Sequence, residues 1–242
     1  MPPPDDRRPP RGRAAVVDAA QPLDEGPHHR VDIARLHVIT PDRVDPTVVT
    51  SVLDAGARWL QVRTKSGPDN ERLSVTDGLI SQCRSAGATV VVNDRADLAA
   101  AAFADGVHLG LDDLPVGAVR RLLDAALGPG AIVGATCRNP EHARLAAAAG
   151  ASYLGVGPVY ATSTKAGLPD PIGLAGLAAV VEAVDLPVIA ISGVTADRVP
   201  EVRATGAHGV AVIGAIFAAA DPAAATAELL DAVDDGTAGG GR

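Results

Sequence analysis

The stretch ATVVVNDRADLAAAAFADGVHLGLDDLP, residues Ala88–Pro115, decides the fold. Two short apolar runs, Ala88–Val92 and Gly106–Leu109, flank an alanine-rich segment of helical composition. Each run is followed by polar residues, Asn93-Asp94 and Asp112-Asp113, which a buried strand does not need. A strand, a helix and a second strand in this order predict two neighbouring parallel strands whose carboxyl ends lie side by side. Acidic side chains from both ends can then converge on one cation.

The same alternation of apolar runs and helical patterns extends over most of the chain. We predict strands at Arg35–Ile39, Trp59–Val62, Thr89–Val92, Gly106–Leu109, Ala131–Gly134, Tyr153–Val156, Pro187–Ile191 and Gly209–Ile213. We predict helices at 46–56, 70–86, 95–103, 116–127, 139–149, 173–184, 196–205 and 221–233. Continuous apolar strands between helices indicate a parallel sheet covered on both faces.

Eight such units in 242 residues favour a closed (β/α)8 barrel, which takes about 250 residues, over an open doubly wound sheet. Helix starts are marked by Asp45-Pro46, Asn139-Pro140 and Asp221-Pro222, each an N-cap residue followed by proline. We expect the barrel to occupy residues 30–234 as a single domain.

Composition restricts the classes of function. The net charge of −8 argues against a nucleic-acid surface, since phosphate backbones need clustered Lys and Arg. Cys83 and Cys137 stand far apart, which predicts buried thiols in a reducing compartment and no zinc site. No apolar run approaches the roughly 20 residues that span a bilayer.

The two ends of the chain differ from the middle. Residues 1–29 are rich in Pro, Arg and Asp, and residues 235–242 read DGTAGGGR, so we predict a disordered extension and a flexible tail. The opening MPPPDDRRPPRGR is followed by no apolar core of the kind a secretory signal has. These features predict a cytoplasmic protein without membrane partners; a homo-oligomer is compatible with the sequence.

In such barrels the chemistry lies at the carboxyl ends of the strands. After Trp59–Val62, alternation places Gln61, Arg63 and Lys65 on one side of the chain, and two cations there suit a diphosphate. A basic strand end paired with helix carboxylates would have the same spacing, and the spacing does not decide between the two.

Acidic residues follow both central strands: Asp94 after the first, and Asp112 and Asp113 after the second. Asp94 with Asp112 or Asp113 can hold Mg²⁺, a cation that prefers oxygen ligands and keeps waters and phosphates. Helix capping explains one acid at each place, and the repetition favours the metal. His108, inside a predicted strand, is expected to be a core or supporting residue.

Two further loops suit phosphorylated ligands. The loop after Tyr153–Val156 holds Thr162-Ser163-Thr164-Lys165 and has the hydroxyls and the cation that a closing loop needs. Small residues follow the last two strands, at Gly193 and Gly214, where barrels often bind phosphate.

Taken together, these motifs resemble the thiamine-phosphate synthase family. The resemblance rests on Gln61-x-Arg63-x-Lys65, Val92-Asn93-Asp94-Arg95, Gly106-Val107-His108-Leu109-Gly110, Gly155-x-Gly157-Pro158-Val159 and Thr162-x-Thr164-Lys165. It extends from about Leu36 to Leu230. It implies a transferase barrel that joins a hydroxymethylpyrimidine diphosphate to a carboxylated thiazole phosphate, with loss of diphosphate and CO2.

The resemblance also implies roles for individual residues. Mg²⁺ would be held by Asp94 and Asp113, and the catalytic cations would be Arg63, Lys65 and Lys165. The residues in contact with substrate would be Gln61, Val62, Arg63, Thr64, Lys65, Asn93, Thr136, Thr162, Ser163, Thr164, Lys165, Gly193, Ile213 and Gly214.

This sequence departs from the family pattern at several positions. Leu111 stands where Gln is common, Thr64 where an acid is common, and Thr136 where Ser is common. Ser192 replaces the first Gly of a Gly-Gly pair, and Gly214 replaces a Ser near the thiazole phosphate, which leaves only the backbone amide there.

Two other functions are weighed against the synthase. A thiazole tautomerase of the same superfamily would carry a catalytic His in the segment where this chain has Arg138. A non-catalytic, phosphate-binding regulatory barrel would have no need of Asp94, Asp113 and Lys165 together.

Overall fold

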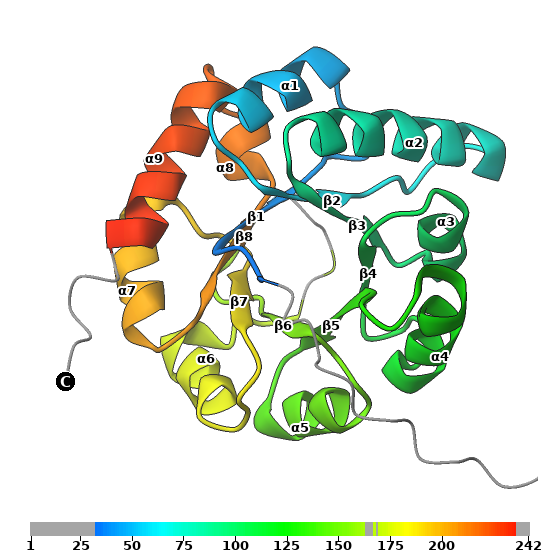
Figure 1. Cartoon of the computed structure of the whole chain (residues 1–242). Helices are drawn as coiled ribbons and strands as arrows, with labels where there is room; N and C mark the ends of the chain where they lie inside the picture. Colours follow the sequence, from blue (N-terminus) through cyan, green and yellow to red (C-terminus); the bar gives the residue numbers. More distant parts are fainter. Residues whose placement is uncertain (1–31, 163–166, 168, 236–242) are drawn as a thin grey trace, which may run out of the picture.

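The computed structural model describes residues 32–162, 167 and 169–235 and shows a closed barrel of eight parallel strands (Figure 1). Each strand pairs with the next, and the last pairs with the first through Leu36 and Val210. The (β/α)8 prediction is confirmed. The strands are β1 (Leu36–Ile39), β2 (Trp59–Val62), β3 (Thr89–Asn93), β4 (Gly106–Leu109), β5 (Ile132–Cys137), β6 (Tyr153–Val156), β7 (Val188–Ile191) and β8 (Gly209–Val212).

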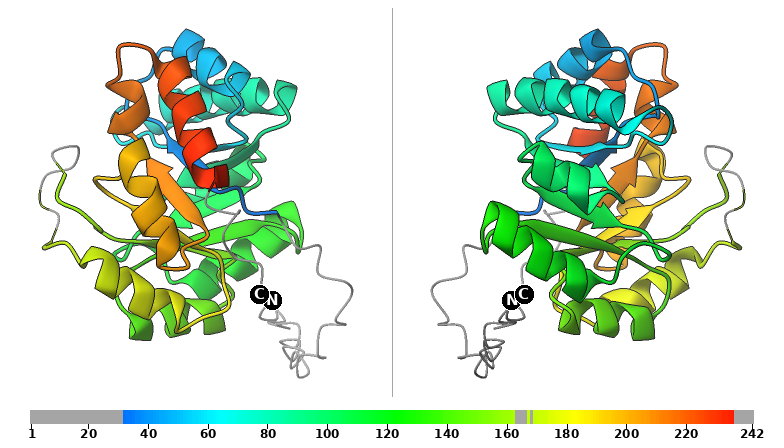
Figure 2. Two further views of the ribbon diagram at one scale, coloured as in Figure 1. Left: turned by 90° about the vertical axis from the view of Figure 1, so that its left-hand side faces the viewer. Right: turned by 90° about the vertical axis from the view of Figure 1, so that its right-hand side faces the viewer.

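The helices form a ring outside the strands (Figures 1 and 2). They are α1 (Pro46–Asp54), α2 (Asp69–Ser85), α3 (Ala96–Ala101), α4 (Val116–Leu127), α5 (Pro140–Ala148), α6 (Gly173–Val181), α7 (Val199–Ala204), α8 (Gly214–Phe217) and α9 (Pro222–Asp235), with a 3₁₀ turn at Ala196–Arg198. In the part of the chain that the structure describes, no helix has both the length and the apolar character needed to cross a membrane.

The helix starts form as the sequence predicts. The side chains of Asp45, Asn139 and Asp221 accept backbone N–H bonds from Thr47, His142 and Ala224 at 2.9, 2.9 and 3.0 Å. These bonds satisfy N–H groups that the first turn of a helix leaves without a partner.

Most predicted elements differ from the structure by one to three residues at an end, and three differences have a clear cause. β5 continues past Gly134 to Cys137, because Thr136 and Cys137 pair with Gly155 and Val156 of β6. The segment expected as one helix over 196–205 begins as a 3₁₀ turn and becomes α7 at Val199, next to Pro200. The four-residue α8 is too short to produce a periodic pattern in the sequence.

Both terminal predictions lie mainly outside the described residues. Residues 1–31 and 236–242 are not part of the described structure, and Asp235 is the last residue of α9.

Alternation of side chains divides the core into two layers. Val38, Leu60, Val62 and Val90 point outward and pack against the helices. The inward-facing residues form the barrel interior: Ile39, Trp59, Val91, Ile132, Tyr153, Ile189 and Ala211. We call Trp59, Tyr153 and His37 the aromatic floor. His37 stacks on Trp59 with ring centroids 4.3 Å apart, and Tyr153 meets both rings edge-on.

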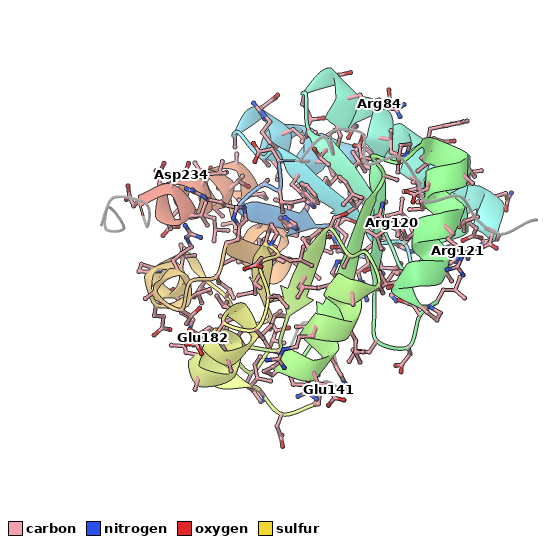
Figure 3. All side chains as sticks on the ribbon, turned by 60° about the horizontal axis from the view of Figure 1, so that its bottom comes forward. Arg84, Arg120, Arg121, Glu141, Glu182 and Asp234 are labelled. Atoms are coloured by element: carbon pink, nitrogen blue, oxygen red, sulfur yellow. The ribbon has the colours of Figure 1, made fainter. Side chains whose placement is uncertain are left out.

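Charged side chains from the helices tie the outer ring together. Figure 3 shows Arg84, Arg121, Glu141 and Glu182 among the labelled side chains of the outer helices. Arg120 of α4 reaches the next unit, where it donates to the Gly150 carbonyl at 2.9 Å and to the Ser152 hydroxyl at 3.0 Å.

A substitution at Gly106 tests how closely β4 and β5 pack at this point. A Cβ atom at Gly106 would lie 2.0 Å from the Ile132 carbonyl oxygen, so Gly106→Ala is expected to lower the free energy of unfolding by about 3 kcal/mol. Urea unfolding measures this. The control is Gly78→Ala in α2, where nothing lies within 4 Å and the stability should rise by about 0.5–1 kcal/mol. Equal effects of the two substitutions would contradict the packing argument.

Candidate active site

Polar side chains gather where the strands end. Gln61 and Asn93 lie on the inward face of β2 and β3, and the Gln61 Nε2 atom donates to Asn93 Oδ1 at 2.7 Å. Gln61 is almost fully buried, whereas Asn93 is partly exposed. The contact fixes both amides at the upper rim of the barrel interior.

Lys65 and Asp94, in the segments that follow β2 and β3, form an ion pair. The Lys65 Nζ atom contacts Asp94 Oδ2. The backbone of Asp94 adopts φ +65°, and its N–H donates to the His108 carbonyl at 2.8 Å, which ties the turn after β3 to β4. An Asp tolerates this left-handed conformation better than most residues.

The Asp113 carboxylate reaches the same place from the loop after β4. Its Oδ2 atom accepts the Gly110 N–H at 2.6 Å. Burial raises the pKa of Asp113, and the adjacent Asp94 carboxylate raises it further. The predicted pair Asp94 and Asp113 therefore does come together, while Asp112 is exposed.

The remaining predicted residues of the β2 loop have different surroundings. The Arg63 N–H donates to the Thr40 hydroxyl at 2.9 Å, and the Thr64 carbonyl accepts from Arg72 at 2.8 Å. The Val62 side chain is fully buried in the layer between strands and helices. This agrees with the alternation that turns Val62 away from Gln61 and Arg63, so a substrate contact of Val62 would be made by its backbone atoms.

Asp42 is a residue that sequence reasoning missed. It lies in the loop after β1, where its carboxylate accepts the backbone N–H groups of Lys65 and Ser66 and, at 2.6 Å, the Ser66 hydroxyl. The Ser66 hydroxyl and the Lys65 N–H lower the pKa of Asp42. Its position after a strand, like that of Asp94, was the signal that could have revealed it.

Three polar side chains from β4, β5 and β6 form a chain below the rim. His108 Nδ1 lies 2.9 Å from the Tyr153 hydroxyl, and His108 Nε2 lies 3.0 Å from the Thr136 hydroxyl. Burial lowers the pKa of His108 to about 4, so the imidazole is neutral at physiological pH. The prediction that His108 supports the core is confirmed.

A cavity of about 220 Å³ lies at the ends of β7 and β8. Its lining includes the predicted residues Thr162, Gly193, Ile213 and Gly214. Gly193 has φ +69°, and a Cβ atom there would lie 2.7 Å from the Ala161 carbonyl oxygen. The close approach of the two loops at this point requires glycine.

Short segments hold the walls of this cavity. The Arg198 guanidinium donates to the Gly193 carbonyl at 2.6 Å and stacks over the Tyr160 ring at 4.5 Å from its centroid. Helix α8 begins at Gly214, directly after β8. Three predicted residues of the neighbouring loop, Ser163, Thr164 and Lys165, lie outside the described residues.

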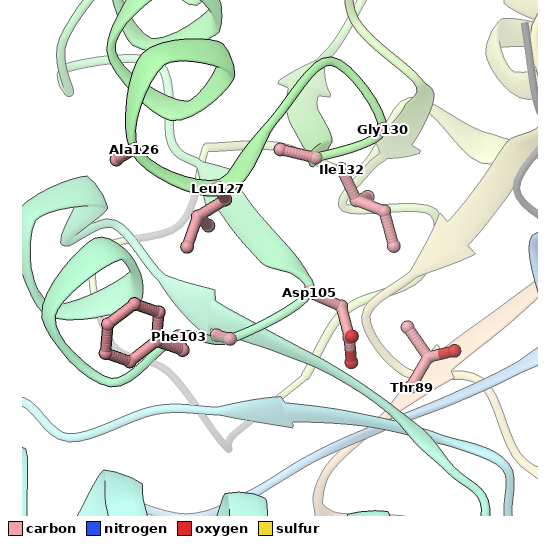
Figure 4. Close-up of a pocket in the computed structure, with 9 residues that line it drawn as sticks. Thr89, Phe103, Asp105, Ala126, Leu127, Gly130 and Ile132 are labelled. Carbon is pink, nitrogen blue, oxygen red and sulfur yellow. The ribbon is translucent and has the colours of Figure 1, made fainter.

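A second cavity, of about 420 Å³, lies at the opposite end of the barrel (Figure 4). It is bordered by Phe103, Leu127 and Ile132 and by the polar residues Thr89 and Asp105. Thr89 and Ile132 begin β3 and β5, Phe103 and Asp105 lie just before β4, and Leu127 ends α4. The cavity is therefore separated from the polar rim by the length of the strands.

Comparison with known proteins identifies close relatives. The family model described as thiamine monophosphate synthase matches residues 36–216. A curated thiamine-phosphate synthase of Salinispora arenicola is 51% identical over 207 residues, which cover 83% of this chain and 98% of the relative. A counterpart from Anaeromyxobacter dehalogenans is 44% identical and covers 88% of this chain and 93% of its own length.

Solved structures agree with this result. A thiamine phosphate pyrophosphorylase from Pyrococcus furiosus superposes with a TM-score of 0.75 at 38% identity and covers 84% of this chain and 96% of its own. A 3-hexulose-6-phosphate synthase at 23% identity and a TM-score of 0.62 shares the fold alone; the match covers 83% of this chain and all of that one.

The acid pair predicts a pH dependence of stability in the absence of divalent cations. The pKa of Asp113 is higher in the folded chain than its ordinary value of 3.8, so folding takes up a proton at this group when the pH lies above 3.8. The contribution of this group to the free energy of unfolding therefore falls as the pH rises above 3.8. Asp113→Asn should therefore be more stable than the wild type near neutral pH and should lose this advantage in acid.

Urea unfolding between about pH 3 and pH 7, with EDTA present, measures the difference between the two proteins. Asp112→Asn, at the exposed neighbouring position, is the matched control and should show no such dependence. A difference between wild type and Asp113→Asn that is constant over the pH range would contradict the prediction.

Proposed function

The chain belongs to the thiamine monophosphate synthase family, and from this we propose how its residues act on two phosphorylated heterocycles. Its activity is that of a thiamine-phosphate synthase, a transferase. The substrates are 4-amino-2-methyl-5-(diphosphooxymethyl)pyrimidine and a carboxylated thiazole phosphate, and the products are thiamine phosphate, diphosphate and CO2. The observation that carries the assignment of residues is the acid pair Asp94–Asp113 beside Lys65 at one end of the barrel.

The acid pair fits Mg²⁺. The Asp94 carboxylate helps to raise the pKa of Asp113, and a divalent cation between the two carboxylates would relieve their repulsion. Within the described residues no cluster of three or more His, Cys, Asp or Glu side chains occurs, so the protein would supply two ligands. Waters and the substrate diphosphate would complete the coordination, as is usual for Mg²⁺. The bound cation would neutralise charge on the diphosphate.

The cations around this site would hold the same diphosphate. Lys65 is half exposed at the rim, with its backbone fixed by Asp42. Arg63 and Lys165 complete the set that we assign to the leaving group. Arg can bind a diphosphate in a bidentate manner, while Lys acts as a point charge.

The amide pair would bind the pyrimidine. Gln61 and Asn93 offer donors and acceptors that the 4-aminopyrimidine edge can match. Because each amide is held by the other, the pair presents one fixed pattern to the ring.

The cavity at β7 and β8 would take the thiazole phosphate. Gly193 and Gly214 leave backbone N–H groups open to a phosphate, and Thr162, Thr164 and Ser163 would add hydroxyls. Ile213 would provide apolar contact with the thiazole ring. In this assignment the second substrate would bind across the rim from the acid pair.

The proposed reaction breaks the bond between the pyrimidine methylene carbon and the diphosphate oxygen. The diphosphate leaves with the electron pair, and the 4-amino group donates electron density to the ring as the cation develops. The thiazole nitrogen then attacks the methylene carbon. The carboxylate leaves as CO2, and the electron pair that it leaves on the thiazole takes up a proton from water. The residues contribute by charge stabilisation and by orientation of the two rings, and no general base is needed.

We also assign the enzyme to the cytoplasm, which agrees with the free, buried thiols of Cys83 and Cys137. The tautomerase alternative would require a His where Arg138 stands, and the Arg138 guanidinium donates instead to the Asp170 carbonyl at 2.8 Å.

The first test is direct coupling. Purified protein with both phosphorylated heterocycles and Mg²⁺ should form thiamine phosphate and diphosphate in equal amounts, and EDTA should abolish the reaction. Product is measured by chromatography after oxidation to a fluorescent thiochrome. Dephosphorylated thiazole serves as a control and should react poorly. Absence of product with metal present would exclude the synthase reaction, and full activity in EDTA would exclude the metal.

The second test is Asp94→Asn. Asn keeps the shape of the side chain and tolerates φ +65°, so the fold should persist while turnover falls by about a hundredfold or more. Steady-state kinetics and Mg²⁺ titration by calorimetry measure the two effects. Asp112→Asn is the control at an exposed position and should retain wild-type kinetics. Near-normal turnover in Asp94→Asn would show that the metal assignment is wrong.

A further inference from the structure

The hydrogen-bonded chain below the rim connects the barrel interior to the site. Tyr153 and His108 are buried, whereas Thr136 is partly exposed near the carboxyl end of β5. The three side chains come from adjacent strands, and their contacts run from the Tyr153 hydroxyl through His108 Nδ1 and Nε2 to the Thr136 hydroxyl. The direction of these bonds decides what Thr136 offers to a ligand.

The donors and acceptors available to Tyr153 and His108 determine which of them donates in their hydrogen bond. Among the residues that the structure describes, His108 Nδ1 is the hydrogen-bond partner of the fully buried Tyr153 hydroxyl. If Nδ1 carried a proton and donated to Tyr153, the phenolic hydrogen would be buried without an acceptor, which costs about 1–3 kcal/mol. Tyr153 therefore donates to Nδ1, and the neutral imidazole carries its proton on Nε2.

The Nε2 proton then determines the state of Thr136. Nε2–H donates to the Thr136 oxygen at 3.0 Å, so the hydroxyl hydrogen of Thr136 cannot point back along the chain. Within the described part of the chain, no second polar side chain contacts this hydroxyl. Its O–H bond is left to donate towards the open end of the barrel.

Two glycines hold the imidazole in this orientation. A Cβ atom at Gly134 would lie 2.3 Å from the Tyr153 ring and 2.5 Å from His108 Nδ1. A Cβ atom at Gly155 would lie 2.7 Å from His108 Cε1. The backbone of β5 and β6 therefore packs directly against the ring, and any larger residue at either place would displace it.

We propose that Tyr153 and His108 are positioning residues that fix the Thr136 hydroxyl as a hydrogen-bond donor to the pyrimidine substrate. The acceptor is either a diphosphate oxygen or a ring nitrogen, both of which lack hydrogens of their own. The inference rests on the proposed function, since it assigns the ligand that Thr136 meets. A donor that cannot turn away stabilises charge on an acceptor without reorganisation during the reaction.

The first experiment is a double-mutant cycle with Tyr153→Phe and Thr136→Val. Tyr153→Phe keeps the ring and removes the donor to Nδ1, so kcat/KM should fall roughly fivefold, the effect of one neutral hydrogen bond. Thr136→Val should cost at least as much. In the Thr136→Val background, Tyr153→Phe should change kcat/KM by less than about twofold, because the hydroxyl it positions is absent.

Two results would overturn the proposal. Equal losses from Tyr153→Phe in both backgrounds would show that the phenol acts through packing alone, and no loss in the wild-type background would show that it does not act at all. Thr226→Val is the matched control: its buried hydroxyl donates to the Pro222 carbonyl within α9, so its loss should leave kcat/KM unchanged.

A spectroscopic measurement tests the chain without any turnover. Imidazole ¹⁵N shifts of His108 in the wild type should show the tautomer protonated at Nε2, and in Tyr153→Phe a mixture of the two tautomers. Protonation at Nδ1 in the wild type would overturn the proposal. Failure of the coupling assay with the expected tautomer present would instead reject the proposed function and leave the geometry standing.

Binding of inorganic diphosphate in the presence of Mg²⁺ identifies the acceptor. If Thr136 donates to a diphosphate oxygen, Tyr153→Phe should weaken diphosphate binding by the same roughly fivefold factor. If it donates to a ring nitrogen, diphosphate binding should be unchanged while the KM for the pyrimidine substrate rises. Unchanged values of both would contradict the proposal.

Discussion

The alternation of side chains along eight parallel strands is the constraint on which the rest of the structure depends. Because successive residues point to opposite faces, every second residue of a strand belongs to the barrel interior and the others belong to the helical layer. Closure of the sheet brings the inward-facing ends together at one rim. Gln61, Asn93 and Thr136 reach that rim because each stands an even number of residues beyond an inward-facing core residue: Trp59, Val91 and Ile132. A shift of one residue in any strand would send these polar groups among the helices.

Charge at the rim follows from the same geometry. The loops after β2, β3 and β4 bring Lys65, Asp94 and Asp113 together, and Asp42, from the loop after β1, holds the backbone of Lys65. Asp42 and Asp113 differ in their surroundings, and their pKa values move in opposite directions. Hydrogen bonds from Ser66 and Lys65 stabilise the Asp42 carboxylate, whereas burial beside Asp94 destabilises that of Asp113. The ionised form of Asp42 is thus stabilised by the protein itself, whereas the ionised form of Asp113 would be stabilised by a cation bound beside it.

The sequence predicts what depends on local patterns and misses what depends on contacts between distant loops. Strand positions and proline-marked helix starts rest on periodicity and capping, and these predictions agree with the structure. Topology predicts that Asp94 meets an acid of the next loop, and the choice of Asp113 over Asp112 came from the resemblance to the family; the structure brings Asp94 and Asp113 together. The position of Asp42 after β1 marks it as a residue of the rim, but its hydrogen bonds reach a loop more than twenty residues away, and no spacing rule predicts these partners. The end of β5 was predicted too early because pairing with β6, not composition, carries that strand to Cys137. The tautomer of His108 is likewise decided by Tyr153, a residue on another strand.

The aromatic floor limits the routes by which ligands can enter and leave the barrel interior. Trp59, His37 and Tyr153 fill the barrel from wall to wall, with exposed fractions of 0–1%. The aromatic floor closes the barrel interior on the side away from the rim. Both heterocycles would therefore enter the proposed site, and all products would leave it, at the carboxyl ends of the strands. When two ligands are bound in such an interior, the one closer to the opening must leave before the deeper one can.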